Sequence, residues 1–144
     1  MGFNMMWNMR HIWVAISTDA KVRAIMNLTS ATPVDIANTI IKRKVLPDQI
    51  STGQRRLAIY FTPSRPGSLE ITSEIVIQID CHIPNNVAGN IDIAHEVLEN
   101  CWKAVKGKNF NGVQLEWDAI LGDLYSSNSH YSTGMRLKYH NVVY

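Results

Sequence analysis

The chain has 144 residues, 46% of them hydrophobic and 18% charged, with a formal net charge of +2. This length suits one domain with a substantial core, and this balance excludes a disordered tail. A charge so close to zero gives no electrostatic reason to expect nucleic acid or an anionic membrane as the main partner.

No internal repeat, low-complexity run or linker interrupts the sequence, so we expect a single domain over residues 1–144. Two cysteines are too few for a disulfide scaffold, which favours a reduced intracellular setting. The N-terminal "MGFNMMWNMR" has no early positive charge and leads into no apolar run of membrane-spanning length. We therefore expect a protein of the cytosol, with no membrane partner.

The N-terminal part, about 5–44, is predicted to be helical. Apolar residues recur three or four apart over 5–28 and would line one face. They are Met9, Trp13, Ile16, Ala20 and Ala24. Ser17 or Thr18 can cap a new helix, so a kink or restart is expected there.

A second helix is predicted to begin at Thr32, which can act as the N-cap. Pro33 suits the first helical position, and Asp35 lies at the positive end of the helix dipole. This helix should end near Lys44, because Pro47 disfavours helix at the residue before it.

The remaining part, about 55–143, is predicted to form a sheet and one packing helix. Residues 55–61 are a short strand, and the proline-rich segment 62–68 is a loop. Residues 71–83 alternate between an apolar odd-numbered side and a largely polar even-numbered side, which is typical of a strand with one buried face.

Three further elements follow. They are a helix over 91–105, a strand within 113–121 and a last alternating strand over 131–143. The helix should bury Ile91, Ala94, Leu98, Cys101, Trp102 and Val105. Short links favour antiparallel pairing, so we expect an α+β two-layer domain with a mainly antiparallel, four-stranded sheet covered by helices.

The motif "HEVLE" places His95 and Glu99 one helical turn apart. A zinc protease helix carries a second histidine where Glu99 stands, and two ligands do not make a metal site. A solvated helix face is the simpler interpretation, and we expect no metal, no cofactor and no enzymatic activity.

Cys81 and Cys101 fall on apolar sides of their elements, where cysteine acts as a small hydrophobe. His82 follows Cys81 but must point to the opposite side of the strand, which makes a catalytic pair physically poor. We therefore expect both cysteines in the core.

Basic residues gather before and within the predicted sheet. They are Lys42, Arg43, Lys44, Arg55 and Arg56. Lysine and arginine are favoured near a helix C-terminus by the dipole alone, so a nucleic-acid patch is the weaker interpretation.

The order of segments resembles that of the tail terminator, or tail-completion, proteins of long-tailed bacteriophages. The segments that carry this resemblance are "STDAKVRAIM", "RLAIYF", "EIVIQIDCHIP", "NIDIAHEVLENCWKAV", "VQLEWDAILGD" and "HYSTGMRLKYHNV". The family's last strand holds an "R-L-x-Y"-like pattern that Arg136, Leu137 and Tyr139 match. The family often has a tryptophan just after the strand's aspartate, where this chain has Cys81 and His82.

The resemblance implies a structural virion protein whose copies form a ring, commonly of six, on the completed tail tube. Such a ring stops tube growth, docks the head connector and lets DNA pass through its channel. It would be located at the head-proximal end of the tail after assembly in the host cytoplasm. A closed ring needs head-to-tail contacts between subunits.

Surface positions for these contacts are hypotheses that rest on exposure inferred from the pattern. For the subunit interface they are Glu74, Gln78, Asp80 and His82. For contacts with the tube and the head they are Arg65, Ser68, Tyr125, Ser127 and Asn128.

Other classes stay open at this stage. A head-completion or connector protein below the portal differs only in its partner. A small DNA-binding module predicts salt-sensitive binding by the monomer, and a metal-dependent enzyme predicts bound zinc.

Overall fold

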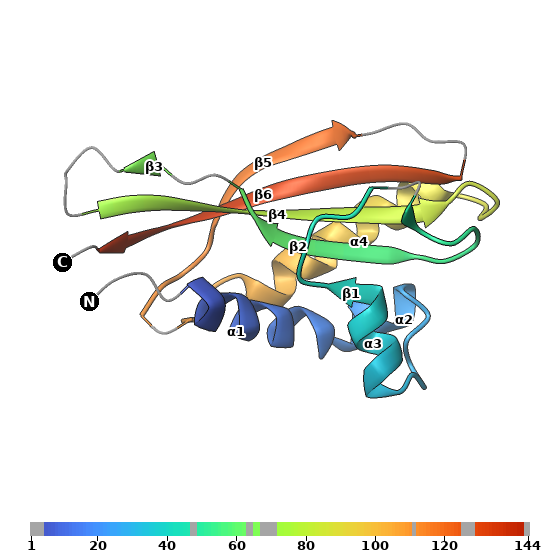
Figure 1. The fold of residues 1–144 in the computed structure, drawn as a ribbon, viewed down its shortest axis with the longest axis horizontal. Coiled ribbons are helices and arrows are strands. Elements are labelled where there is room, and N and C mark those ends of the chain that lie inside the picture. Colours follow the sequence, from blue (N-terminus) through green and yellow to red (C-terminus); the bar gives the residue numbers. More distant parts are fainter. Residues whose placement is uncertain are drawn as a thin grey trace.

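The computed structural model describes residues 5–46, 49–62, 65–66, 72–110, 112–124 and 129–142. Over these residues the fold is α+β, with four helices and one mixed sheet (Figure 1). The strand order is β1-β2-β4-β6-β5, and the short β3 pairs with β4 as well. The α+β prediction is therefore confirmed, but the sheet has more strands than the mainly antiparallel, four-stranded one expected, and its β1–β2 pair is parallel.

The N-terminal helical pattern is split into α1 (Met5–Ser17) and α2 (Ala20–Ile25). The expected restart is present, but its N-cap is Asp19, whose carboxylate accepts a hydrogen bond from the N–H of Val22 at 3.1 Å. Thr18, an expected cap, instead donates its hydroxyl back to the carbonyl of Val14 at 2.6 Å.

Because the helix is interrupted, α2 does not continue the helical phase of α1. The apolar face predicted over 5–28 is therefore correct in α1 and wrong in α2. Met9 and Ile16 are buried as predicted, whereas Ala20 and Ala24 are exposed. In α2 the buried residue is Val22.

Helix α3 (Pro33–Thr39) begins as predicted, because the Thr32 hydroxyl accepts from the N–H of Asp35 at 3.2 Å. It ends earlier than expected, at Thr39 rather than at Lys44. Ile40 and Ile41 form β1 (Ile40–Ile41), which pairs in parallel with β2. Two β-branched residues fit a sheet better than a helix, and here the sheet offers a partner strand.

Strand β2 (Arg56–Phe61) runs antiparallel to β4 (Thr72–Pro84). The two-residue β3 (Arg65–Pro66) pairs with the start of β4, shifted by one residue relative to β2. It therefore continues the line of β2 along the same side of β4, and part of the loop predicted over 62–68 is strand.

On the other side of β4 lies β6 (His130–Val142), and β5 (Glu116–Asp123) forms the edge beyond it. Strands β5 and β6 are antiparallel, with two register shifts in their pairing. The end of the sheet built by β3, the start of β4 and the end of β6 lies beyond the helices (Figure 1).

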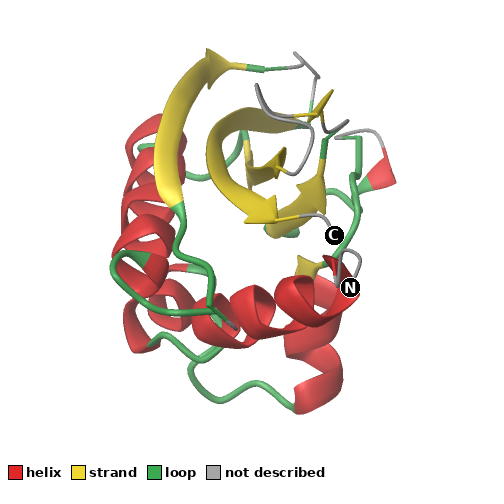
Figure 2. Cartoon of the chain, turned by 90° about the vertical axis from the view of Figure 1, so that its left-hand side faces the viewer, coloured by secondary structure: helices red, strands yellow, loops and turns green. Residues whose placement is uncertain are grey.

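Helix α4 (Asn90–Val105) packs on β4 and β6, close to its predicted bounds. Its buried residues include Ala94, Leu98, Cys101 and Val105, but Ile91 is 52% exposed. Seen from one end of the molecule, the sheet is strongly curved and the helices lie along one side of it (Figure 2). No helix within the described ranges is both long and apolar enough to cross a membrane.

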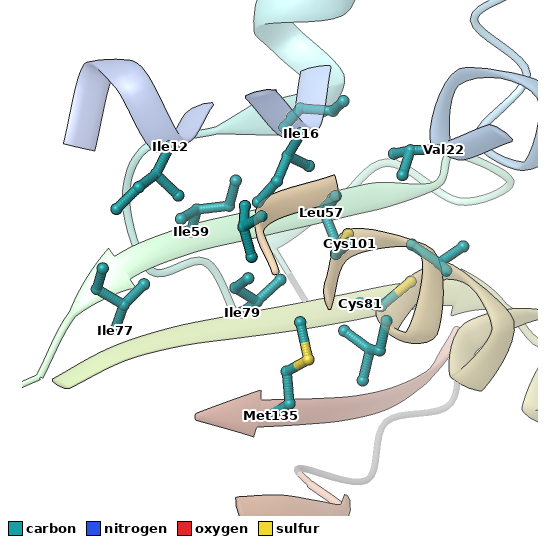
Figure 3. Packing of buried hydrophobic residues seen from close by; sticks show 14 of the residues in the cluster. Ile12, Ile16, Val22, Leu57, Ile59, Ile77, Ile79, Cys81, Cys101 and Met135 are labelled. Carbon is teal, nitrogen blue, oxygen red and sulfur yellow. The ribbon is translucent and has the colours of Figure 1, made fainter. Parts of the chain in front are cut away.

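The main core lies between this helical layer and the odd-numbered side of β4, which we call the apolar face. Figure 3 shows Ile12 and Ile16 of α1 facing Ile59 of β2, with Met135 of β6 beside β4. Because this cluster joins all layers, the N-terminal helices and the sheet share one core.

Candidate functional site

The even-numbered side of β4, which we call the polar face, was predicted to be exposed and to contact other subunits. The expected exposure is wrong for three of the four residues proposed. Gln78 is 8% exposed, Asp80 4% and His82 2%, and only Glu74 is half-buried. The exposure from which the subunit interface was inferred is therefore absent at these three residues, and the interface itself stays a prediction.

The polar face is covered because the segment between β1 and β2 folds across it. Val45 and Ile50 of that segment pack on Ala58 of β2 in a second, smaller apolar cluster. The same segment is tied to β6, where Nε2 of the buried His130 lies 2.7 Å from the carbonyl oxygen of Gln54. A carbonyl only accepts, so this nitrogen carries the proton and donates it.

A chain of hydrogen bonds crosses three strands of the polar face and centres on Asp80. Tyr60 donates its hydroxyl to one carboxylate oxygen at 2.5 Å, and the amide of Gln78 donates to the other at 2.8 Å. Arg136 in turn donates from Nε to the amide oxygen of Gln78 at 3.2 Å. The network satisfies a carboxyl group that would otherwise be costly to bury.

Burial nevertheless dominates the electrostatics of this carboxyl and raises the pKa of Asp80 above its ordinary value. The hydrogen bonds from Tyr60 and Gln78 oppose that rise, as do the charges of Lys44 and Arg136. Burial also raises the pKa of Tyr60, and its bond to Asp80 adds to this. Both groups thus favour their neutral forms more than they would in water.

His82 lies farther along the polar face, opposite Ser132 of β6. Its Nδ1 lies 2.6 Å from the Ser132 hydroxyl, whereas its buried Nε2 has no hydrogen-bond partner among the described residues. Burial, with a smaller contribution from the charge of His130, lowers the pKa of His82 from 6.5 to about 4. The fold therefore holds this imidazole neutral.

The residues predicted to contact the tube and the head are mostly not described. Arg65 lies in β3, where its backbone pairs opposite Glu74. The other four predicted contacts, Ser68, Tyr125, Ser127 and Asn128, lie outside the described residues.

The five basic residues of the weaker DNA-binding hypothesis do not form one exposed patch. Lys42, Arg43 and Lys44 are exposed. Arg55 and Arg56 are half-buried, and their guanidinium groups bond within the chain, to the carbonyl of Ile25 and to Gln54 respectively.

The two residues of the metal hypothesis have other partners. His95 Nε2 lies 3.3 Å from the Tyr131 hydroxyl, and Glu99 pairs with Lys103 at 3.2 Å. Within the described residues, no three histidine, cysteine or acidic side chains gather in a way that could hold a metal ion.

The core position expected for both cysteines is confirmed. Cys81 and Cys101 are fully buried with free thiols, and burial raises the pKa of each. The neighbouring His82 lies on the other side of the strand, as the alternation predicts. Neither thiol is placed for nucleophilic chemistry, because a thiolate is disfavoured in apolar surroundings.

Two features at opposite edges of the sheet are not predictable from the sequence pattern alone. At the β5 edge, Trp117 is 44% and Ile120 55% exposed. Beside the β1 edge lies an open pocket of about 390 Å³, lined in part by Trp13 and Lys42. The sequence signal for the first feature is a pair of large apolar residues in the acidic segment "EWDAILGD". This signal does not show that the strand lies at the edge of the sheet.

Comparison with known proteins adds no identification. No protein-family model matches the chain, and no curated protein shows significant sequence similarity to it.

Proposed function

We propose that the protein is a structural virion subunit that closes the head-proximal end of a long-tailed phage tail. In this proposal, copies form a ring, commonly of six, that stops growth of the tail tube and joins it to the head connector. DNA passes through the channel of the ring, and the subunit itself performs no catalysis.

The observation that carries the proposal is the order and length of the elements. Short N-terminal helices are followed by the long β2–β3–β4 hairpin, then by α4 and by the β5–β6 hairpin. This is the order of the segments in which the sequence resembles tail terminator proteins. The two 13-residue strands β4 and β6 also carry the sheet beyond the helical layer (Figure 1). Among the described residues this end of the sheet lies beyond the helices, which supports a role in contacts with other proteins.

A head-completion protein below the portal remains the nearest alternative, because it would use the same ring and differ only in its partners. DNA binding by the monomer is less well supported, since two of its five basic residues bond within the chain.

The test is the mass of the purified chain in solution, measured by light scattering alone and after mixing with tail tubes that lack a terminator. A ring of subunits seen at tube ends by electron microscopy supports the proposal. A chain that ignores tubes but binds head connectors points to the head-completion alternative. A monomer that ignores both, and instead binds DNA or carries zinc, overturns the proposal.

A further inference from the structure

The two edges of the sheet differ in charge. Strand β5 contains Glu116, Asp118 and Asp123 and no lysine or arginine. Lys138 of the neighbouring strand pairs with Asp118 at 3.7 Å and offsets one of the three acids. The β5 edge therefore carries net negative charge.

The same edge presents a half-covered apolar surface. Trp117 and Ile120 lie opposite Leu137 and Met135, so they belong to the apolar face of the sheet. Helix α4 packs on β4 and β6, and it meets this edge through Trp102, whose ring lies 5.7 Å from that of Trp117 in a T-shaped contact. This contact holds the Trp117 ring in place while leaving much of it exposed, as in a preorganised binding residue.

The opposite edge offers a basic pocket. Beside β1, the open pocket of about 390 Å³ is lined by Trp13, Ala37, Asn38, Ile40, Ile41, Lys42 and Arg43. Its wall is fixed, because the indole N–H of Trp13 donates to the carbonyl of Ile40 at 2.6 Å and Lys42 lies over the indole ring at 5.1 Å. The bond also occupies an edge carbonyl, so a partner docks here through side chains rather than as an added strand.

We infer that the β5 edge of one subunit docks on this pocket in a second copy of the same chain. Trp117 and Ile120 contact the pocket. The acids of the β5 edge, Asp123 on the same face of the strand and Glu116 on the other, attract Lys42 and Arg43 of the neighbour. Charge complementarity favours a second copy of the chain as the partner. The β5 edge supplies acidic and apolar groups, and the β1 edge supplies a pocket with basic residues at its rim. A buried tryptophan seated in a pocket is the usual centre of such an interface.

Because the two complementary surfaces lie at opposite edges of one sheet, the contact is head-to-tail. It repeats from subunit to subunit and closes into a ring if the rotation allows. The role of such a ring, as the cap of a tail tube, rests on the proposed function. The contact between the two edges is inferred separately from the surfaces described above.

Disulfide trapping tests the contact directly. A double variant, Ile120→Cys with Ala37→Cys, is expected to give a ladder of covalent oligomers under mild oxidation, which ends at the ring size. The native Cys81 and Cys101 are fully buried and do not compete. Each single variant alone should give no ladder. Dimers from Ile120→Cys alone would indicate a two-fold contact between β5 edges and overturn the inference, as would no cross-link at all.

Charge reversal gives a second, independent test. Glu116→Lys with Asp123→Lys, or Lys42→Glu with Arg43→Glu, should each weaken self-association at least tenfold, more at low than at high ionic strength. Mixing these two variants restores association, because each supplies the charge that the other lacks. The control for the second variant, Lys21→Glu with Lys103→Glu, makes the same charge change as Lys42→Glu with Arg43→Glu, but in the groove between α2 and α4, and should have no effect. Equal loss in the control, or no rescue on mixing, overturns the inference.

These results separate the two proposals. A chain that caps tail tubes but gives no ladder keeps the proposed function and loses this interface. A chain that gives the ladder but ignores tail tubes keeps the interface and loses the proposed function.

Discussion

From residue 77 to residue 82 the two faces of β4 are almost equally enclosed, yet they are held by different forces. On the apolar face Ile75, Ile77 and Ile79 are all fully buried against helices and neighbouring strands. On the polar face Asp80 and His82 are buried nearly as deeply, under the segment that precedes β2. Alternation along a strand therefore shows which side is apolar, and it does not show that the other side is exposed.

The two faces should respond differently to mutation and to pH. Hydrophobic burial on the apolar face is non-directional and does not depend on protonation. The polar face depends on hydrogen bonds between specific atoms and on the charge states of two ionisable groups. Variants on one face therefore test whether the two faces differ in their response to mutation and to pH.

The largest effect is expected on the apolar face. Ile79→Ala removes fully buried methyl groups and leaves a cavity, which typically costs about 2–5 kcal/mol of unfolding free energy. Chemical unfolding should give the same cost at acid and at neutral pH. Val34→Ala, at a side chain that is 67% exposed, is the control and should change stability by less than about 0.5 kcal/mol. If the loss of unfolding free energy in Ile79→Ala varied with pH, the apolar face would not be independent of protonation.

His82 should make the polar face sensitive to acid. Its pKa is lowered from 6.5 to about 4 in the folded chain, so the stability it contributes is complete above 6.5 and is lost as the pH falls towards 4. A shift of this size corresponds to roughly 3 kcal/mol. In the variant His82→Gln the free energy of unfolding should fall less across this range than in the wild type.

The control for His82 is His11→Gln, at an exposed position of α1, which should retain the full acid sensitivity of the wild type. If His82→Gln kept the same pH slope, His82 would not be held neutral by the fold.

A third effect comes from close packing at Gly134, which lies opposite Asp80 in the sheet. A Cβ added there would lie 2.5 Å from the Asp80 carboxylate and 3.2 Å from the carbonyl of Ile79. The carboxylate cannot move without loosening its bonds to Tyr60 and Gln78. Gly134→Ala should therefore cost about 1–3 kcal/mol of unfolding free energy, measured by chemical denaturation.

A double-mutant cycle identifies the cause of that cost. In an Asp80→Ala background the clash is absent, and Gly134→Ala should lose most of its effect. An undiminished cost in this background would place the strain elsewhere, at the backbone of Ile79 or at the side chain of Leu124.

Features set by local sequence were predicted well. The start of α3 depends on Thr32, Pro33 and Asp35, which are neighbours in the chain, and the structure has the predicted cap. Likewise, α4 and the long strand β4 follow from apolar periodicity alone and lie within a residue of their expected bounds.

Features set by contacts between distant segments were not predictable in this way. Ile40 and Ile41 leave the helix because β2 pairs with them, and a local pattern does not show which distant strand will pair with a segment. The polar face is buried because the segment near Gln54 reaches His130, which is 76 residues away. The exposed Trp117 is informative only once β5 is known to be an edge.

The smallest effect should come from Tyr60, and its sign depends on Asp80. The pKa of Asp80 is raised by burial, so its contribution to stability is complete below the ordinary value of 3.8 and is lost as the pH rises through the folded-state pKa. The Tyr60 hydroxyl opposes that rise, because it donates to the carboxylate at 2.5 Å. Tyr60→Phe should therefore cost about 1 kcal/mol in acid and more at neutral pH, where the carboxylate loses a stabilising donor.

The matched control is Tyr131→Phe, since the Tyr131 hydroxyl donates to Asp123 at 2.6 Å on the exposed edge. An exposed carboxylate exchanges that lost bond for water, so the control should cost little at any pH. If both variants lost the same small amount of unfolding free energy at every pH, the Tyr60–Asp80 hydrogen bond would behave like a solvent-exposed one. A cost that grows with pH in Tyr60→Phe alone would instead mark the polar face as an interior whose stability is governed by protonation, unlike the apolar face behind it.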